Sequence, residues 1–291
     1  MHYLLLSLMP LVAYATSIID ATLADPSPPR PDKLPAISPP FNYTAIEAGL
    51  AEHLSLASFR MEGLNASARM IPQACKDRAK DYHMQPSDLQ VFRSTYDDCE
   101  QPWVMCRHNN ATVSMQDITT VFGRIPLGMR QFTRHLIVLP SASLPPGCAG
   151  VSSDDAIVVG DSALKHFVLA HEISHSLDAR NRPTTTPTPN SNSNLPIGIS
   201  ISPTWRASYA LDSATVSEYA RSAWPEQLAE TGVAALYDAV VPGGLASAGN
   251  PSYGGVMNQV GAWRREFGRF VDGEGGCGLR RPDSPMVGWD D

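Results

Sequence analysis

The chain has 291 residues, with 22 Lys and Arg against 29 Asp and Glu, so its formal net charge is −7 at pH 7. This negative charge argues against a nucleic-acid partner, which would require a basic surface. Hydrophobic residues make up 43% of the chain, and its length suffices for one sizeable core. No stretch beyond the N-terminus is long and apolar enough for a transmembrane helix, so we expect no membrane partner.

The N-terminus has the pattern of a targeting segment. Residues 4–12 form an apolar run of signal-peptide length, which is too short to span a membrane. Ala13-Tyr14-Ala15 follows as a small-x-small cleavage site, so we predict a signal peptide over residues 1–15. The mature protein is therefore expected to be secreted and extracellular.

The next segment, residues 16–40, is rich in proline and is either an extended linker or a short pro-segment. We expect the remainder, residues 41–291, to form one domain. Three sequons, at Asn42, Asn65 and Asn110, predict N-linked glycans and agree with a secretory address.

The cysteines predict a disulfide framework. In an oxidising compartment, five cysteines give two disulfides and one odd thiol. Cys99 and Cys106 are close enough in sequence to clip a loop, which would leave Cys75 to pair with Cys148; other pairings stay open. No two cysteines have C-x-x-C spacing, so a zinc-ribbon site is disfavoured. The five are Cys75, Cys99, Cys106, Cys148 and Cys277.

Apolar patterns predict several elements in chain order. Residues 44–64 have a helical pattern, and residues 134–139 and 155–160 are expected to form buried strands. A helix should then begin at an N-cap supplied by Asp161 or Ser162.

This helix carries an H-E-x-x-H motif made by His171, Glu172 and His175. Residues four apart share one face of a helix, so both imidazoles can reach one metal ion. Glu172 lies beside them and can accept a proton from an attacking water. A chance match on a surface helix is the alternative, because the motif is short.

The residues after the motif disfavour a metzincin, the subclass of zinc metallopeptidases in which a turn glycine and a third metal ligand follow H-E-x-x-H. Asp178 and Asn181 occupy the positions of its turn glycine and its third ligand. Pro183 prevents the helix from running far past Asn181. Residues 183–203 then form a loop rich in Ser, Thr, Pro and Asn, which overhangs the cleft, carries O-glycans or is a disordered insertion.

A second predicted helix offers the third ligand. Pro225 is well placed as its first residue, and Leu228 and Val233 belong to an apolar stripe. Glu226 and Glu230 lie one turn apart at the edge of that stripe, where carboxylates are costly unless something pairs with them. A zinc ion and a ligand histidine would do so. An ordinary acidic first turn, favoured by the helix dipole, is the alternative.

The two segments together resemble the catalytic core of gluzincins such as anthrax lethal factor. In that core, an Asp follows the H-E-x-x-H motif after three residues, as Asp178 does here. A Tyr, six intervening residues, the ligand Glu and a second Glu four positions on are matched by Tyr219, Glu226 and Glu230. The match covers residues 165–237. The overall layout also resembles secreted fungal proteins of the conidiation-specific metalloprotease type.

The resemblance implies an α+β fold of the zincin-like metallopeptidase type, with an active-site helix carrying H-E-x-x-H and a second helix carrying the ligand Glu. It implies a secreted zinc metalloendopeptidase that binds one Zn²⁺ per chain and hydrolyses peptide or protein substrates. It makes His171, His175 and Glu226 the metal ligands. Glu172 would be the general base, and Tyr219 would stabilise the transition state. We expect a monomer.

Further residues would support this site, and two alternatives stay open. Asp178 and Glu230 would each orient a ligand imidazole. One alternative is a catalytically silent homologue that acts as a secreted cell-wall or surface binding protein. The other is an aspzincin with Asp212 or Asp178 as third ligand, although the Gly- and Thr/Tyr-rich segment of that class is missing. Residues 273–291 look like an irregular tail.

Overall fold

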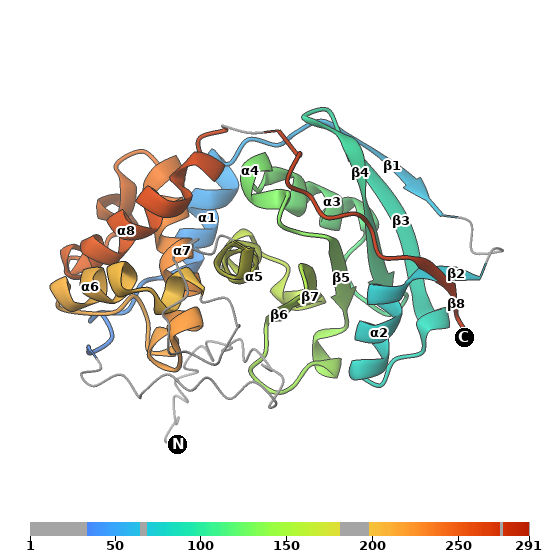
Figure 1. Cartoon of the computed structure of the whole chain (residues 1–291), viewed down its shortest axis with the longest axis horizontal. Coiled ribbons are helices and arrows are strands. Elements are labelled where there is room, and N and C mark those ends of the chain that lie inside the picture. The colour runs from blue at the N-terminus through green and yellow to red at the C-terminus, as the bar shows by residue number, and fades with distance from the viewer. Residues whose placement is uncertain (1–33, 65–68, 181–197, 274–275, 291) are drawn as a thin grey trace, which may run out of the picture.

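The computed structural model describes residues 34–64, 69–180, 198–273 and 276–290. They form a mixed α+β fold in which helices cover a six-stranded sheet (Figure 1), so the predicted α+β class is confirmed. The signal peptide, residues 16–33, the Asn65 sequon and residues 183–197 of the predicted loop lie outside the described residues. None of the described helices is both long enough and apolar enough to cross a membrane.

Strands and helices are interspersed up to residue 160, and the chain after it is mainly helical. The large sheet contains β1 (Phe59–Gly63), β3 (Leu89–Tyr96), β4 (Cys99–His108), β5 (His135–Leu139), β6 (Gly150–Ser153) and β7 (Ala156–Gly160). A separate ladder pairs β2 (Met70–Pro72) with β8 (Met286–Gly288). The α-helices of the described residues are α1 (Tyr43–His53), α2 (Gln73–Asp81), α3 (Met115–Arg124), α4 (Leu127–Arg130), α5 (His166–Arg180), α6 (Pro203–Leu211), α7 (Trp224–Val240) and α8 (Met257–Phe267).

The large sheet is mixed, with its strands in the order β1-β3-β4-β5-β7-β6. β4, β5 and β7 run parallel, whereas β1, β3 and β6 pair antiparallel with their neighbours. β5 and β7 are buried at every position, because both faces of the sheet are covered, and this explains their nearly continuous apolar runs. The strands predicted over residues 134–139 and 155–160 are confirmed to within one residue.

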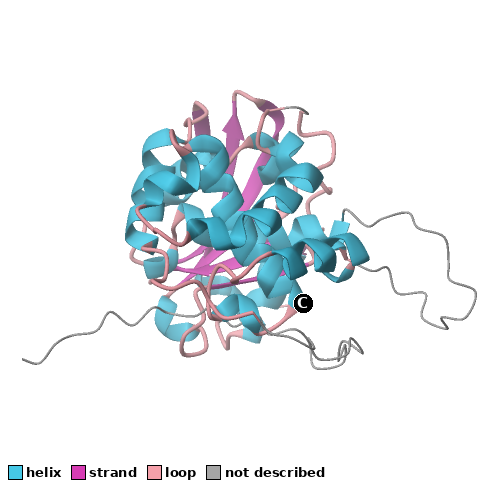
Figure 2. Ribbon diagram, turned by 90° about the vertical axis from the view of Figure 1, so that its left-hand side faces the viewer, coloured by secondary structure: helices cyan, strands magenta, loops and turns pink. Residues whose placement is uncertain are grey.

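Each face of the sheet has its own core. One face packs against α2, in a cluster that includes Ile71, Cys106 and Ile137. The other face packs against α3 and α5, and α7 and α8 form a further layer beyond α5 (Figure 1). Figure 2 views the molecule from this helical side, where the helices lie in front of the strands. Helix α5 is therefore enclosed between the sheet and a second helix.

The helix predicted over residues 44–64 is only partly present. Helix α1 ends at His53, and Phe59–Gly63 forms the edge strand β1 instead. β1 pairs with β3 along its whole length, and the amide of Ala57 donates to the carbonyl of Gly123. Pairing with a distant strand thus overrides the local helical pattern.

The two disulfides, Cys75–Cys106 and Cys99–Cys277, differ from the predicted pairs. The pairs Cys99–Cys106 and Cys75–Cys148 are wrong, because Cys99 and Cys106 both lie on β4. Seven steps of about 3.3 Å along an extended strand hold them about 23 Å apart. Cys148 takes part in neither bond. Two disulfides, the number that was predicted, fit an extracellular protein.

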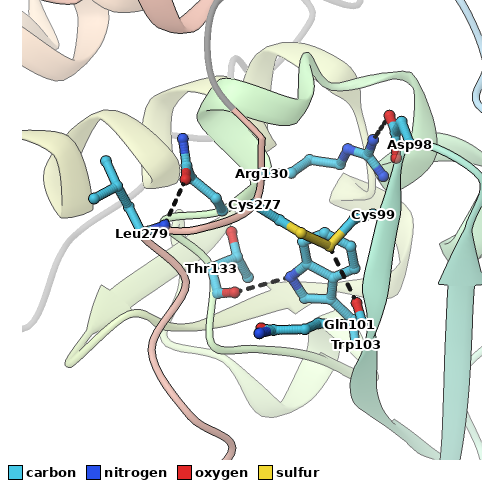
Figure 3. Close-up of a disulfide and its surroundings, with 9 residues drawn as sticks. Asp98, Cys99, Gln101, Trp103, Arg130, Thr133, Cys277 and Leu279 are labelled. Atoms are coloured by element: carbon cyan, nitrogen blue, oxygen red, sulfur yellow. Dashed lines mark hydrogen bonds and ion pairs between the residues drawn. A yellow bond between two sulfur atoms is a disulfide. The ribbon is translucent and has the colours of Figure 1, made fainter.

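The predicted irregular tail is tied to the sheet. Cys277 bonds to Cys99 at the start of β4, beside the buried ring of Trp103 (Figure 3). The amide of Leu279 donates to Gln131 Oε1 at 3.0 Å, and β8 then pairs with β2. Distant contacts, rather than local pattern, give this segment its structure.

The last residues of the proline-rich segment also join the fold. Ile37 is buried, and its amide donates to the carbonyl of Thr215 at 2.8 Å. The amide of Thr215 in turn donates to the carbonyl of Pro35 at 2.9 Å. Residues 34–40 therefore brace the chain that leads into α7.

Helices α5 and α7 cross at close range. A Cβ on Gly232 of α7 would lie 2.2 Å from Ser174 Oγ on α5 and 2.9 Å from Trp263 Nε1. Real Cβ atoms do not come so close to other heavy atoms, so the crossing depends on a glycine here. The close approach brings the H-E-x-x-H face of α5 against the first two turns of α7.

Candidate metal centre

Helix α5 carries the H-E-x-x-H motif, as predicted, but a different residue caps it. Asp161 and Ser162, the expected N-caps, belong to a separate 3-10 turn that precedes the helix. The carboxylate of Glu47 on α1 accepts instead from the amides of His166 and Phe167, at 3.2 and 3.3 Å. The start of α5 is thus fixed by a neighbouring helix, for which the local sequence gives no signal.

Three donor atoms converge between α5 and α7. His171 Nε2 lies 3.2 Å from both His175 Nε2 and Glu226 Oε2, and His175 Nε2 lies 3.3 Å from the same oxygen. The imidazoles come from successive turns of α5, and the carboxylate comes from the first turn of α7. Helix α7 begins at Trp224, one residue before the predicted first residue, Pro225. Within the described part of the chain, no other group of three or more His, Cys, Asp or Glu side chains is close enough to share a metal ion.

These donor atoms fit a zinc ion in type and spacing. Zinc is held by imidazole nitrogens and carboxylate oxygens at about 2.0–2.2 Å, and tetrahedral geometry then separates two ligand atoms by about 3.3–3.6 Å. The observed separations of 3.2–3.3 Å lie at or just below the short end of this range. Glu230 Oε1 lies 3.0 Å from His171 Nδ1, as the sequence predicted, which favours a proton on Nδ1 and a free lone pair on Nε2.

The buried carboxylates of the centre favour a positive charge between them. Burial disfavours the charged form of His171, but Glu226 and Glu230 outweigh it and raise the pKa of this imidazole well above its usual value. Burial likewise opposes the charge of Glu226, yet His175 and His171 lower the pKa of that carboxyl. Buried carboxylates need a cation beside them, and a proton or a metal ion can serve.

Glu172 points toward the edge strand β6. A Cβ on Gly150 would lie 2.9 Å from Glu172 Oε1, so a larger residue in this strand would crowd the carboxylate. Glu172 is 1% exposed, and no described residue forms a hydrogen bond with its Oε2 atom. Burial raises the pKa of Glu172, and the charges of His171 and His175 lower it only in part. A buried carboxylate with a raised pKa and an unpaired oxygen is suited to proton transfer.

Tyr219 lies beside the imidazole of His171. It begins η6 (Tyr219–Arg221), the 3-10 turn that leads into α7, and its ring centroid is 6.0 Å from that of His171. The structure therefore brings together the five residues that the sequence predicts as metal ligands or catalytic groups, and those roles stay predictions. The five are His171, Glu172, His175, Tyr219 and Glu226.

Two other carboxylates have partners away from the donor atoms. Asp178 accepts from the amide and the hydroxyl of Ser200, at 2.8 and 2.6 Å. These two bonds hold Ser200 against α5, and the orientation of an imidazole by Asp178 stays a prediction. Asp212 accepts from the amides of Asn258 and Gln259, at 2.9 and 2.8 Å. The third position of the centre therefore belongs to Glu226 and not to either aspartate.

Some residues that shape the centre have little or no signal in the sequence. Tyr43 donates from its hydroxyl to Glu230 Oε2 at 2.7 Å, and no pattern around α1 marks this contact. Gly232 does give a weak signal, because a glycine inside a predicted helix costs stability unless close packing requires it. Gly150 gives the same signal inside a strand.

Comparison with known proteins identifies the family of the chain. The model of the Con-13 family, described as conidiation-specific protein Con-13, matches residues 55–272. Conidiation-specific protein 13 of Neurospora crassa is 27% identical over 212 residues, which cover 69% of the chain and 57% of that protein. The chain thus spans little more than half the length of this relative, and no solved structure matches it. Neither description states an activity. The family match includes every residue of the donor group, and the chain belongs to the Con-13 family of conidiation-specific proteins.

Proposed function

We propose that this protein is an extracellular zinc-dependent endopeptidase whose metal ligands are His171, His175 and Glu226. The observation that carries the proposal is the convergence of their three donor atoms within 3.2–3.3 Å of one another. The arrangement of elements agrees with the predicted zincin-like fold. One helix with the H-E-x-x-H motif packs between the sheet and a second helix, which contributes the glutamate.

The donor set suits catalysis as well as binding. Two imidazoles and one carboxylate are typical of catalytic zinc sites, which keep a fourth position for water or substrate. A bound zinc ion would lower the pKa of a water molecule and polarise a substrate carbonyl. Glu230 would hold the His171 ring in its orientation through the Nδ1 contact of 3.0 Å.

Glu172 would transfer the proton. Its buried Oε2 atom has no hydrogen-bond partner among the described residues, and the side chain is next to His171 in sequence. Glu172 would accept a proton from the attacking water and pass it to the leaving amine. Tyr219, beside His171, would donate a hydrogen bond from its hydroxyl to the oxyanion that develops on the substrate carbonyl.

The edge strand β6 supports a peptide as the substrate. β6 is at the end of the strand order, pairs with β7 alone among the described strands, and contains Gly150, which lies next to Glu172. An extended peptide can add to such an edge through backbone hydrogen bonds. A peptide bound along β6 would therefore present its carbonyl groups near the proposed general base.

Hydrolysis of a quenched-fluorescent peptide library tests the proposal. The secreted protein should cleave peptides, lose activity with a chelator and regain it with zinc. Glu172→Gln should keep zinc and lower kcat by about 10²–10⁴-fold, because Gln cannot accept a proton. Glu266→Gln, an exposed glutamate on α8, is the matched control and should match the wild type. Wild-type activity in Glu172→Gln would contradict the proposal, whereas an inactive wild type with full zinc would favour the silent homologue.

A further inference from the structure

Helix α1 reaches the candidate centre through a chain of hydrogen bonds. The Tyr43 hydroxyl donates to Glu230 Oε2 at 2.7 Å, and the other oxygen of the same carboxylate lies 3.0 Å from His171 Nδ1. Glu230 is 11% exposed at its side chain, so water competes little for these contacts. Because each carboxylate oxygen has its own partner, the plane of the carboxylate is fixed relative to the imidazole.

The same face of α1 also holds the start of α5. Glu47 lies one turn beyond Tyr43 and is 2.9 Å from His166 Nδ1, in addition to accepting from two amides of α5. The ring of Tyr43 packs on Phe167 with centroids 5.2 Å apart. Helix α1 therefore contacts both helices that carry the donor atoms, at two positions spaced by one helical turn.

Close packing fixes α1 on α7 as well. A Cβ on Gly49 of α1 would lie 2.6 Å from Tyr237 Cε2, so the two helices approach closely there. The position of the Tyr43 hydroxyl is thus set by the contact between helices and not by a flexible loop. Helix α1 ends at His53, before the family match begins at residue 55, so this support comes from outside the matched region.

We propose that Tyr43 is a positioning residue of the metal centre, which acts through Glu230 on His171. The inference rests on the proposed function, since it assumes that His171 binds a metal. Removing the hydroxyl takes away one of the groups that hold the Glu230 carboxylate and leaves it to His171 and Ser217, so the acceptor of the imidazole is less firmly fixed. Zinc affinity should fall, because partners of ligand imidazoles contribute about 10–100-fold to metal affinity.

A double-mutant cycle on zinc affinity tests the inference without reliance on peptide hydrolysis. Zinc dissociation constants are measured by chelator competition for the wild type, Tyr43→Phe, Glu230→Gln and the double variant. We expect about tenfold weaker binding in Tyr43→Phe and about 10–100-fold weaker binding in Glu230→Gln. In the double variant, Tyr43→Phe should add less than about twofold, because the residue it acts through is already changed. Melting curves of the zinc-free proteins check that each variant is folded.

Tyr237→Phe is the matched control. Tyr237 also lies between α1 and α7, but its hydroxyl is near Ser247 Oγ, at 3.4 Å, so its loss should leave zinc affinity within about twofold. Unchanged affinity in a folded Tyr43→Phe variant overturns the inference while leaving the proposed function intact. A full Tyr43→Phe effect on top of Glu230→Gln also overturns it, because Tyr43 would then act by another route. A wild type that binds no zinc overturns both proposals.

Discussion

The side chains around the candidate centre fall into two groups, those that would hold the metal and those that would act on the substrate. Tyr219 belongs to the second group, because its ring is beside His171 but it is no part of the donor group. Tyr219→Phe should keep zinc and lower kcat by about 10²–10³-fold with little change in KM, since the oxyanion exists only in the transition state. Steady-state kinetics combined with metal analysis would check this, and an unchanged kcat would remove Tyr219 from the mechanism.

Asp161 gives the fold a dependence on pH at the turn before α5. Burial opposes its charge, but hydrogen bonds from Thr112 and Ser141 outweigh burial and lower its pKa to about 2. A carboxyl with a lowered pKa stabilises the fold fully above its unfolded pKa of about 3.9, and this contribution is lost as pH falls through about 2.

Replacement of Asp161 by Asn should therefore matter most near neutral pH. Asp161→Asn should lower the free energy of unfolding by about 1–2 kcal/mol at pH 7, because Asn cannot accept from all five donors that Thr112, Ser141 and Ser162 supply. The difference from the wild type should shrink below about pH 4. Urea denaturation at several pH values would measure it, and a difference that stays constant down to pH 2 would refute the assignment.

Spacing along one helix explains which residues of the centre the sequence could predict. His171 and His175, like Glu226 and Glu230, lie one turn apart, so local geometry places each pair on one face. Tyr43 is 187 positions from Glu230, and nothing in its neighbourhood signals a distant carboxylate. Contacts of this kind depend on how helices pack, which a single sequence does not reveal.

At the scale of elements, the crossing of α5 and α7 sets the geometry of the donor atoms. Gly232→Ala would gain about 1 kcal/mol of helix propensity, but its Cβ would meet the buried Ser174, and overpacking costs about 1–3 kcal/mol. We expect lower stability and weaker zinc binding together. Gly261→Ala on α8 is the matched control, since its Cβ would meet only Arg265 at 3.5 Å, and this change should stabilise the protein. Thermal melts that shift both variants in the same direction would contradict this account of the crossing.

The elements predicted correctly are those with a strong local pattern. Helices α5 and α7 carry their motifs within the segment, although Glu47 of α1 fixes the start of α5, and β5 and β7 are apolar runs buried on both faces. Strand β1 and the C-terminal segment were missed, because their structure comes from distant pairing. Phe59 pairs with Tyr96, and Met286 pairs with Pro72, and neither partner is visible in the local sequence.

For the whole molecule, the Cys99–Cys277 bond joins the sheet to the C-terminal segment across 178 positions. A bond that closes so long a loop restricts the unfolded chain strongly, so Cys277→Ser should lower the free energy of unfolding by about 2–5 kcal/mol. The candidate centre lies on other elements, and zinc affinity of the folded variant should change little. Chemical denaturation would measure the first effect, and a loss below about 0.5 kcal/mol would show that the bond contributes little.

The overall class and the number of disulfides were predictable, whereas their connectivity was not. Composition and a signal-peptide pattern indicate an oxidising compartment, but pairing depends on which strands carry the cysteines. Cys106 faces Cys75 on α2, and Cys99 meets Cys277 of the tail, because β4 separates the two cysteines along its length. Proximity in sequence was misleading because an extended strand connects them.

Metal analysis of the purified protein tests the central claim most directly. The wild type should contain one zinc ion per chain, Glu172→Gln should retain it, and Glu226→Ala should lose most of it, because only the last change removes a ligand. This difference in zinc content between the two variants would distinguish a general base, Glu172, from a metal ligand, Glu226. A wild type without zinc after dialysis into zinc-containing buffer, or a Glu226→Ala variant with full zinc, would contradict the account.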